Sequence, residues 1–221
     1  MTQAYTIDPS RMDYHNHIRE EIIPLVPNGG GTLLDVGGGV GATAVRLKQL
    51  GKADRVGVID LIDSAVEGVN KDFSYSGNIE DSVFLDSVLE AEGSLQTILC
   101  LDVLEHLVDP WKIIARLHQA LVPGGVIVAS VPNVRHYSAF LPLAFCNSWD
   151  LADDGILDRT HLRFFVRDTA IKLMTCSGLK LEEISGHAPG GIKLKLARAF
   201  SFGALNSFTN LQYLIRVRRV D

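Results

Sequence analysis

The sequence predicts an α/β protein with a Rossmann-like, doubly wound, seven-stranded and mostly parallel sheet that ends in an antiparallel C-terminal edge pair. Two observations predict this class. Short apolar, β-branched runs alternate with amphipathic helical patterns between residues 32 and 178, which is typical of parallel sheets with helices on both faces. The last two strand-like runs have no helix-and-strand rhythm between them, which favours an antiparallel pair.

Seven runs carry the predicted strands. Most are apolar on both faces, as strands that are covered on both sides must be. The runs are Thr32–Val36, Arg55–Asp60, Phe73–Asn78, Thr97–Asp102, Gly125–Val131, Lys180–Ile184 and Gln212–Val217.

The helix between the fourth and fifth predicted strands has the strongest local signals. Asp109 is suited to the N-cap and Pro110 to the first helical position. An apolar stripe follows, and we expect the helix to end at residues 123–125, Pro-Gly-Gly. The stripe consists of Trp111, Ile114, Leu117 and Leu121.

Two further helices are predicted from their ends. One spans Ala42–Leu50 and stops at Gly51, and the other spans Thr169–Ser177 with Asp168 as its N-cap. Residues 1–28 are expected to form an N-terminal helical cover. Residues 132–167 follow the carboxyl end of a predicted strand, where open α/β sheets bind their ligands, so we expect them to form a substrate lid.

Size and composition exclude several classes of protein. The chain has 221 residues, 47% of them hydrophobic and 21% charged, which fits one globular domain over residues 1–221. A net charge of −5 argues against a nucleic-acid partner. The longest apolar run, Ala139–Cys146, is too short for stable membrane insertion. Three cysteines without CxxC spacing fit a reducing compartment, and we expect a cytoplasmic protein.

A glycine-rich turn is the most informative local feature. The segment Leu34–Thr43 runs from a predicted strand through Gly37, Gly38, Gly39 and Gly41 into a predicted helix. Glycines permit positive φ and let a ligand approach the backbone closely. The spacing also satisfies the dinucleotide fingerprint, so an NAD-dependent oxidoreductase remains an alternative.

Asp35 favours a different ligand. A carboxylate at the mouth of the loop would repel a pyrophosphate, by about 4 kcal/mol for two unit charges roughly 4 Å apart near a protein surface. The same carboxylate would attract a ligand with an ammonium and a sulfonium group. S-adenosylmethionine carries both. Asp60, at the end of the next predicted strand, suits ribose hydroxyls with either ligand.

Four motifs together resemble those of class I S-adenosylmethionine-dependent methyltransferases, and the resemblance covers nearly the whole chain. They are the glycine loop Asp35–Gly41, the acid Asp60, the segment Gly77–Glu80 and the segment Leu101–His106. The segments 132–136 and 155–165 further resemble small bacterial methyltransferases of polysaccharide and other glycan gene clusters.

This resemblance implies a set of cofactor contacts. The backbone of residues 37–41 would surround the methionine portion of the cofactor, and Asp35 would contact its amino group. The other implied contacts are Asp60 to the ribose with Leu61 beside it, Asn78 and Ile79 to the adenine, and Leu101 to the ammonium with Asp102 next to it. Asn78 stands where the family often has Asp, and Asp63 is a rival for the ribose.

Histidines are the first candidates for the base that would deprotonate a hydroxyl acceptor. We predict His161 as this base and His136 as the second choice, because both lie in the expected lid. His106 ranks below them, and Tyr14 is a minor candidate. Each histidine could instead serve in a local hydrogen bond. No HExxH or CxxC spacing is present, so no metal site is predicted.

The sequence therefore predicts a methyltransferase that acts on a small molecule or a glycan precursor, at oxygen. A binding module that senses the cofactor without turnover is a further alternative. A homodimer is left open as the assembly.

Overall fold

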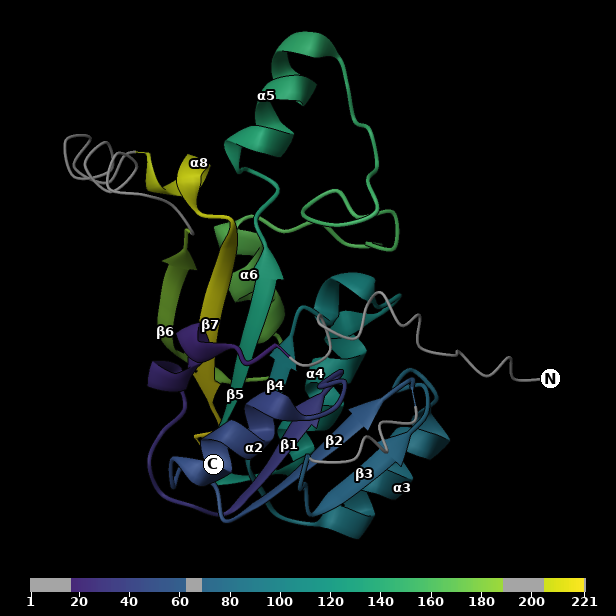
Figure 1. The fold of residues 1–221 in the computed structure, drawn as a ribbon, viewed down its shortest axis with the longest axis vertical. Coiled ribbons are helices and arrows are strands. Elements are labelled where there is room, and N and C mark those ends of the chain that lie inside the picture. Colours follow the sequence, from purple (N-terminus) through teal and green to yellow (C-terminus); the bar gives the residue numbers. More distant parts are fainter. Residues whose placement is uncertain (1–16, 63–68, 189–204, 221) are drawn as a thin grey trace.

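The computed structural model describes residues 17–62, 69–188 and 205–220. Its seven strands form one sheet in the order β3-β2-β1-β4-β5-β7-β6 (Figure 1). The strands are β1 (Thr32–Val36), β2 (Arg55–Asp60), β3 (Phe73–Ser76), β4 (Leu95–Leu101), β5 (Leu121–Pro132), β6 (Lys180–His187) and β7 (Gln212–Arg218).

The strand pairing confirms the predicted fold class. The first five strands are parallel, and β7 runs antiparallel to both β5 and β6. The register of the central strand pairs Asp35 with Val58 on one side and with Leu99 on the other. Because β1 has β2 and β4 as its neighbours, the strand order reverses at the carboxyl end of β1, which is where such sheets bind ligands.

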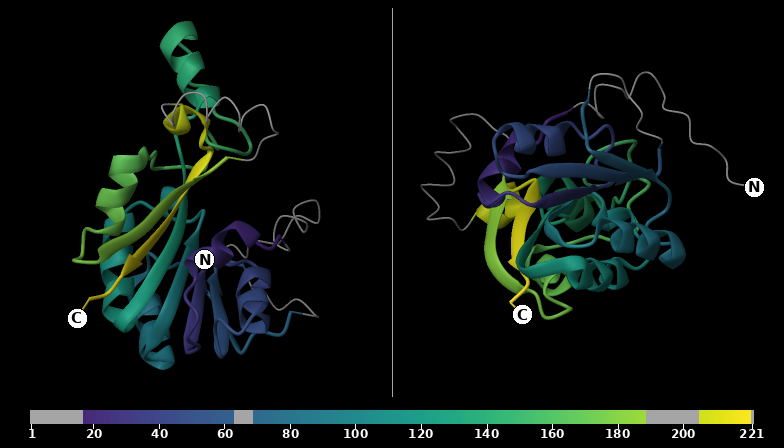
Figure 2. Two further views of the ribbon diagram at one scale, coloured as in Figure 1. Left: turned by 90° about the vertical axis from the view of Figure 1, so that its left-hand side faces the viewer. Right: turned by 90° about the horizontal axis from the view of Figure 1, so that it is seen from below.

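Helices cover both faces of the sheet, as Figure 2 shows. One core cluster contains apolar side chains of α3 (Ser82–Glu92), α4 (Pro110–Ala120) and α6 (Arg167–Met174). The other contains side chains of the 3-10 helix η2 (Glu20–Leu25) and of α2 (Ala42–Gln49). The sheet is therefore doubly wound. The remaining described helices are η3 (Leu104–His106), α5 (Tyr137–Cys146) and α8 (Asn206–Thr209).

Two helix predictions need correction. Asp168 is not the N-cap of α6, because the helix already includes Arg167 and begins after Val166, whose N–H donates to Thr169 Oγ1 at 3.0 Å. The helix α4 ends at Ala120, and the Pro-Gly-Gly segment belongs to β5.

The buried face of α4 also differs from the predicted stripe. Trp111 is 44% exposed, and Ile113 is buried in its place. The face that packs on the sheet carries Ile113, Ile114 and Leu117, which follow the helical period from Pro110.

The expected lid contains α5, which projects beyond the carboxyl ends of the strands (Figure 1). The two ends of the lid meet in a bridge between Asn133 and Phe165, and Val134 N donates to Phe165 O at 2.9 Å. Among the described residues no helix is long and apolar enough to cross a membrane. Most of the expected N-terminal cover, residues 1–16, lies outside the described residues.

Candidate functional site

The glycine loop between β1 and α2 can be built only from residues without a side chain at its tightest points. Gly37 has a φ of 70°, and a Cβ there would lie 2.4 Å from Val103 Cγ2. A Cβ on Gly38 would lie 2.5 Å from Asp35 Cγ. Gly39 and Gly41 also have positive φ, of 56° and 88°. The loop therefore packs tightly on its neighbours and leaves its backbone uncovered by side chains of its own.

Asp60 joins the loop to the neighbouring strands. Its Oδ2 accepts a hydrogen bond from Gly39 N at 2.8 Å, and its Oδ1 accepts one from Ile62 N at 3.1 Å. Its carbonyl oxygen accepts from Gly77 N at 2.9 Å, which ties the ends of β2 and β3 together. Leu61 beside it is 62% exposed. The rival acid, Asp63, lies outside the described residues.

Asp35 lies buried below the loop, with 2% of its surface exposed. Burial, followed by the charge of Asp60, raises the pKa of Asp35 to about 7, and the nearby Arg19 opposes this shift. A buried carboxyl group with a raised pKa is ionised more readily when a cation binds beside it. This arrangement can hold an ammonium or sulfonium group.

The segment after β3 turns tightly at the same edge of the sheet. Asn78 Oδ1 accepts from Glu80 N at 2.9 Å, and its carbonyl accepts from Asp81 N at 3.0 Å. Ile79 is buried in the core cluster below. The side chain of Asn78 therefore stabilises its own turn. The hydrogen bond from Gly77 N to Asp60 O holds this segment, with the backbone of Ile79, near the end of β2.

Asp102 follows Leu101, the last residue of β4, and does not extend the strand as predicted. Its φ of 55° turns the chain at this point. Ser130 Oγ donates to Asp102 Oδ1 at 2.7 Å, and Arg19 forms an ion pair with the same carboxylate. The predicted cofactor residues of β1, β2, β3 and β4 thus gather at one sheet edge.

Arg19 is the residue that sequence reasoning missed at this edge. Its guanidinium also donates to Gln212 Oε1 at 3.2 Å and pairs with Glu21, while its backbone N donates to Thr43 Oγ1 at 3.1 Å. Burial lowers the pKa of Arg19, but the carboxylates of Asp102 and Glu21 outweigh it, so the pKa is raised overall. Arg19 precedes η2 by one residue and shows no motif, so only its contacts reveal it.

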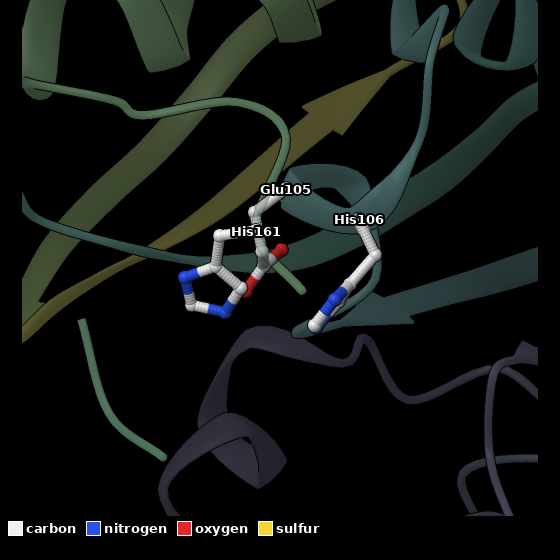
Figure 3. A group of neighbouring side chains, drawn as sticks. All are labelled: Glu105, His106 and His161. Carbon is white, nitrogen blue, oxygen red and sulfur yellow. The ribbon is translucent and has the colours of Figure 1, made fainter. Parts of the chain in front are cut away.

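A second group of polar side chains lies beside the end of β4 (Figure 3). His161, which comes from the lid, has its ring centroid 4.7 Å from that of His106 in η3. Glu105 contributes a carboxyl group within 4.8 Å of a ring nitrogen of each. The lid is held here because Leu162 N and Arg163 N donate to Glu105 O at 2.8 and 2.9 Å.

His136 lies away from this group and serves its own helix. Its Nδ1 is 2.8 Å from Ser138 Oγ and accepts from Ser138 N at 3.4 Å, which caps the start of α5. Burial lowers the pKa of His136. Of the two predicted bases, only His161 lies beside a carboxyl group and a second imidazole, whereas the ring of His136 lies beside that of Tyr137. Tyr14 lies outside the described residues.

Two cavities lie away from the glycine loop. One, of about 500 Å³, is lined by α3, α4 and the start of β5, at the amino ends of the strands. The other, of about 340 Å³, lies between α8, β6 and β7. Neither includes the glycine loop or Asp35, so both are separate from the candidate site.

Comparisons with known proteins identify the family of this chain. Residues 8–184 match a family described as a methyltransferase domain. The ubiquinone biosynthesis O-methyltransferase of Xanthomonas euvesicatoria pv. vesicatoria is 29% identical over 187 residues, which cover 82% of this chain and 73% of the relative.

Two solved structures have a similar fold. The S-adenosylmethionine dependent methyltransferase from Mesorhizobium loti has a TM-score of 0.58 and 17% identity, over 90% of this chain and 96% of its own. The N-methyltransferase NodS from Bradyrhizobium japonicum, in complex with S-adenosyl-L-homocysteine, has a TM-score of 0.56 and 16% identity, over 97% of this chain and 89% of its own.

The sheet order and the similar solved structures define a Rossmann-like α/β fold of the kind that methyltransferases have. Because the family match spans more than half of the chain, this protein belongs to the methyltransferase-domain family. It is an S-adenosylmethionine-dependent methyltransferase.

Proposed function

We propose that this methyltransferase transfers the methyl group of S-adenosylmethionine to a hydroxyl oxygen of a small molecule or a glycan precursor. One observation carries the proposal. The buried and half-buried acids around the glycine loop suit a cationic cofactor. They lie at the same sheet edge as the imidazoles of His106 and His161, which suit a hydroxyl acceptor.

The cofactor half of this proposal assigns each group by its chemistry. Asp35 holds the ammonium group, since its carboxyl is buried next to the loop. Asp60 and Leu61 face the ribose, Asn78 and Ile79 the adenine, and Leu101 offers a carbonyl. Asp60 Oδ2 already accepts a hydrogen bond from Gly39 N. A ribose hydroxyl would therefore either replace Gly39 N as the donor or donate to the same carboxylate in addition to it.

Arg19 adds a group for the other charge of the cofactor. The methionine portion carries a carboxylate as well as an ammonium, and the two require a cation and an anion side by side. Arg19 lies close enough to Asp35 to lower its pKa, and its guanidinium binds the carboxylate of Asp102. We assign the cofactor carboxylate to Arg19.

The acceptor half places the hydroxyl group beside Glu105, His106 and His161. Methyl transfer is an in-line displacement, so the chain mainly orients the acceptor and removes its proton. His161 Nδ1 is 3.0 Å from Ile156 O, and a carbonyl can only accept, so Nδ1 carries the proton and Nε2 keeps a lone pair. Relatives named O-methyltransferases support oxygen as the acceptor atom.

The family assignment replaces the two alternatives raised by the sequence, an NAD-dependent oxidoreductase and a binding module without turnover. The buried acid at Asp35 also disfavours NADH. Four expectations stay predictions. They are one domain over residues 1–221, a cytoplasmic location, no nucleic-acid partner and a homodimer as one form of assembly.

The test combines binding and turnover. Calorimetry with the purified chain should show saturable binding of S-adenosylmethionine and none of NADH. Radiolabelled cofactor should then label hydroxylated aromatics or sugar nucleotides, and an amine-only panel should stay unlabelled. The control variant Asp86→Asn changes an acid paired with Arg116 away from the site, and it should behave like the parent. Labelling of amines alone would contradict oxygen as the acceptor.

A further inference from the structure

Glu105 is the least satisfied charged group in the described part of the chain. It is 1% exposed, and neither of its carboxylate oxygens has a hydrogen-bond partner among the described residues. Burial, followed by the nearby charge of Asp102, raises the pKa of Glu105 well above its usual range. A buried carboxyl group in this state is costly unless a cation or a proton is bound to it.

The two neighbouring imidazoles are oriented by hydrogen bonds on their far side. His161 Nδ1 donates to Ile156 O at 3.0 Å. His106 Nδ1 lies 3.3 Å from Thr160 O and 3.0 Å from Thr160 Oγ1. Thr160 Oγ1 in turn donates to Asp158 Oδ1 at 2.6 Å, so this hydroxyl can only accept from the ring. Both rings therefore carry their proton on Nδ1 and keep the lone pair of Nε2.

This is the arrangement that metal ligands have in proteins. A histidine that binds a metal usually donates its other ring N–H to a carbonyl or a carboxylate, which fixes the tautomer and the ring orientation. Here a backbone carbonyl serves His161, and a threonine connected to Asp158 serves His106.

We propose that Glu105, His106 and His161 form a binding site for a divalent transition-metal ion, with Zn²⁺ as its representative. One ligand atom of each lies within 4.8 Å of the others. Ligand atoms around a tetrahedral Zn²⁺ are separated by roughly 3.3 Å, so small side-chain rotations complete the site. Two imidazoles and one carboxylate favour Zn²⁺ over Mg²⁺, which prefers oxygen ligands.

The ligand set explains why no local spacing indicated a metal. Glu105 and His106 are adjacent in η3, and His161 comes from the lid 55 positions further along the chain. The backbone of Glu105 already accepts hydrogen bonds from Leu162 and Arg163. A bound ion would therefore fasten the same lid segment to the end of β4 and leave a coordination position for an oxygen ligand.

The metal site also sharpens the role of His161. An ion bound to Nε2 would occupy the lone pair that a general base needs, so His161 would hold the ion rather than take the proton. The ion would lower the pKa of an acceptor hydroxyl bound to it, and the proton would pass to solvent water. The assignment of the metal site does not depend on methyl transfer. Its test measures metal binding in the absence of cofactor and acceptor.

The experiment uses the full chain without a histidine tag, stripped with EDTA and titrated with Zn²⁺ against a chromophoric chelator. We expect one Zn²⁺ per chain, a rise in Tm on addition of Zn²⁺, and a visible absorption band with Co²⁺ that Zn²⁺ removes. Mg²⁺ at the same concentration should displace neither ion. Mg²⁺ competing as strongly as Zn²⁺ would show that the imidazoles are not ligands and would overturn the proposal.

Three variants locate the site. Glu105→Gln and His161→Gln keep the side-chain size or polarity but remove a ligand, and each should weaken Zn²⁺ binding by at least about tenfold. His17→Gln changes an exposed histidine outside the group and should leave binding unchanged. Circular dichroism checks that each variant is folded. An absence of saturable Zn²⁺ binding in the parent, or equal binding in all three variants, would overturn the proposal.

Discussion

The proposed cofactor side and the proposed acceptor side of the site are stabilised in different ways. On the cofactor side, Asp60 accepts from the backbone of Gly39 and Ile62, and the loop is already held in shape. On the acceptor side, Glu105 lies buried without a hydrogen-bond partner among the described residues. On the cofactor side, the backbone therefore fixes the loop, and the buried carboxyl group of Asp35 is balanced by a proton or by the ammonium group of the cofactor. On the acceptor side, the carboxyl group of Glu105 is balanced by a proton or by a bound metal ion.

The difference also follows from where the residues stand in the chain. The cofactor side uses short segments that each follow a strand, so its geometry comes with the parallel sheet. The acceptor side brings a lid residue, His161, to a 3-10 helix at residues 104–106. We therefore expect substitutions on the cofactor side to change affinity for the cofactor and those on the acceptor side to change turnover or metal binding.

The largest expected effect comes from removing the acid below the loop. Asp35→Asn keeps the side-chain shape but cannot attract an ammonium group, and we expect the Kd for S-adenosylmethionine to rise about 100-fold. Calorimetry measures the change. An unchanged Kd would show that the cofactor half is assigned wrongly.

The same variant should be more stable without cofactor. The difference between the ordinary pKa of 3.8 and the value of about 7 corresponds to up to about 4 kcal/mol of destabilisation above pH 7. Urea denaturation of the ligand-free chain at pH 8 should show this gain. A decrease in stability would indicate that the ionised carboxylate is already paired.

The glycine loop provides a matched pair of substitutions. Gly37 and Gly51 both have a φ of 70°, but a Cβ on Gly37 would lie 2.4 Å from Val103 whereas nothing lies within 4 Å of one on Gly51. Gly51→Ala should cost about 1 to 2 kcal/mol from backbone strain alone and leave the Kd unchanged. Gly37→Ala should cost more and weaken cofactor binding at least about tenfold, because the loop must shift. Equal Kd values for the two variants would show that the loop shape is not needed for binding.

Cofactor affinity should depend on pH through Asp35. Its pKa is about 7 in the free protein, and a bound ammonium favours the ionised form. Below pH 7 binding must release the proton, so the affinity should fall about tenfold per pH unit, while above pH 7 it should be constant.

The stability of the free protein should change in the opposite direction. Because folding raises the pKa of Asp35, the free energy of unfolding keeps its full value below pH 3.8 and falls as the pH rises through about 7.

Calorimetry at pH 6, 7 and 8 for the parent and Asp35→Asn tests the pH dependence of cofactor affinity. A slope that persists in the variant would assign the titration to another group.

The sequence was sufficient for the fold and for the places of the proposed cofactor residues at the ends of strands. Strand ends at Val36 and Asp60 were predicted correctly, because apolar runs and a glycine turn are contiguous signals. Asp102 was predicted within a strand, yet it adopts a positive φ that its contacts with Ser130 and Arg19 stabilise. Such contacts come from segments that are distant in the sequence, so no local sequence pattern predicts them.

The acceptor side shows the same limit more strongly. His161 was selected because of its place in the lid, but nothing in the sequence indicated that Glu105 would be buried beside it. A glutamate at the start of a short helix is usually solvated, and only the fold reveals that its carboxyl lacks a partner within the described residues. His136, the second choice for the base, was selected from the same lid but caps α5.

The smallest expected effect concerns His136 and distinguishes its two roles. Asn is a good N-cap residue and cannot act as a base, so His136→Asn should keep α5 in place. If capping is the role of His136, kcat should change less than about threefold and Tm should shift little, whereas His136→Ala should lose about 1 kcal/mol of stability. Steady-state kinetics and thermal melts of both variants provide the measurement. A large loss of kcat in His136→Asn, with Tm unchanged, would restore His136 as a base and extend the acceptor side to the start of α5.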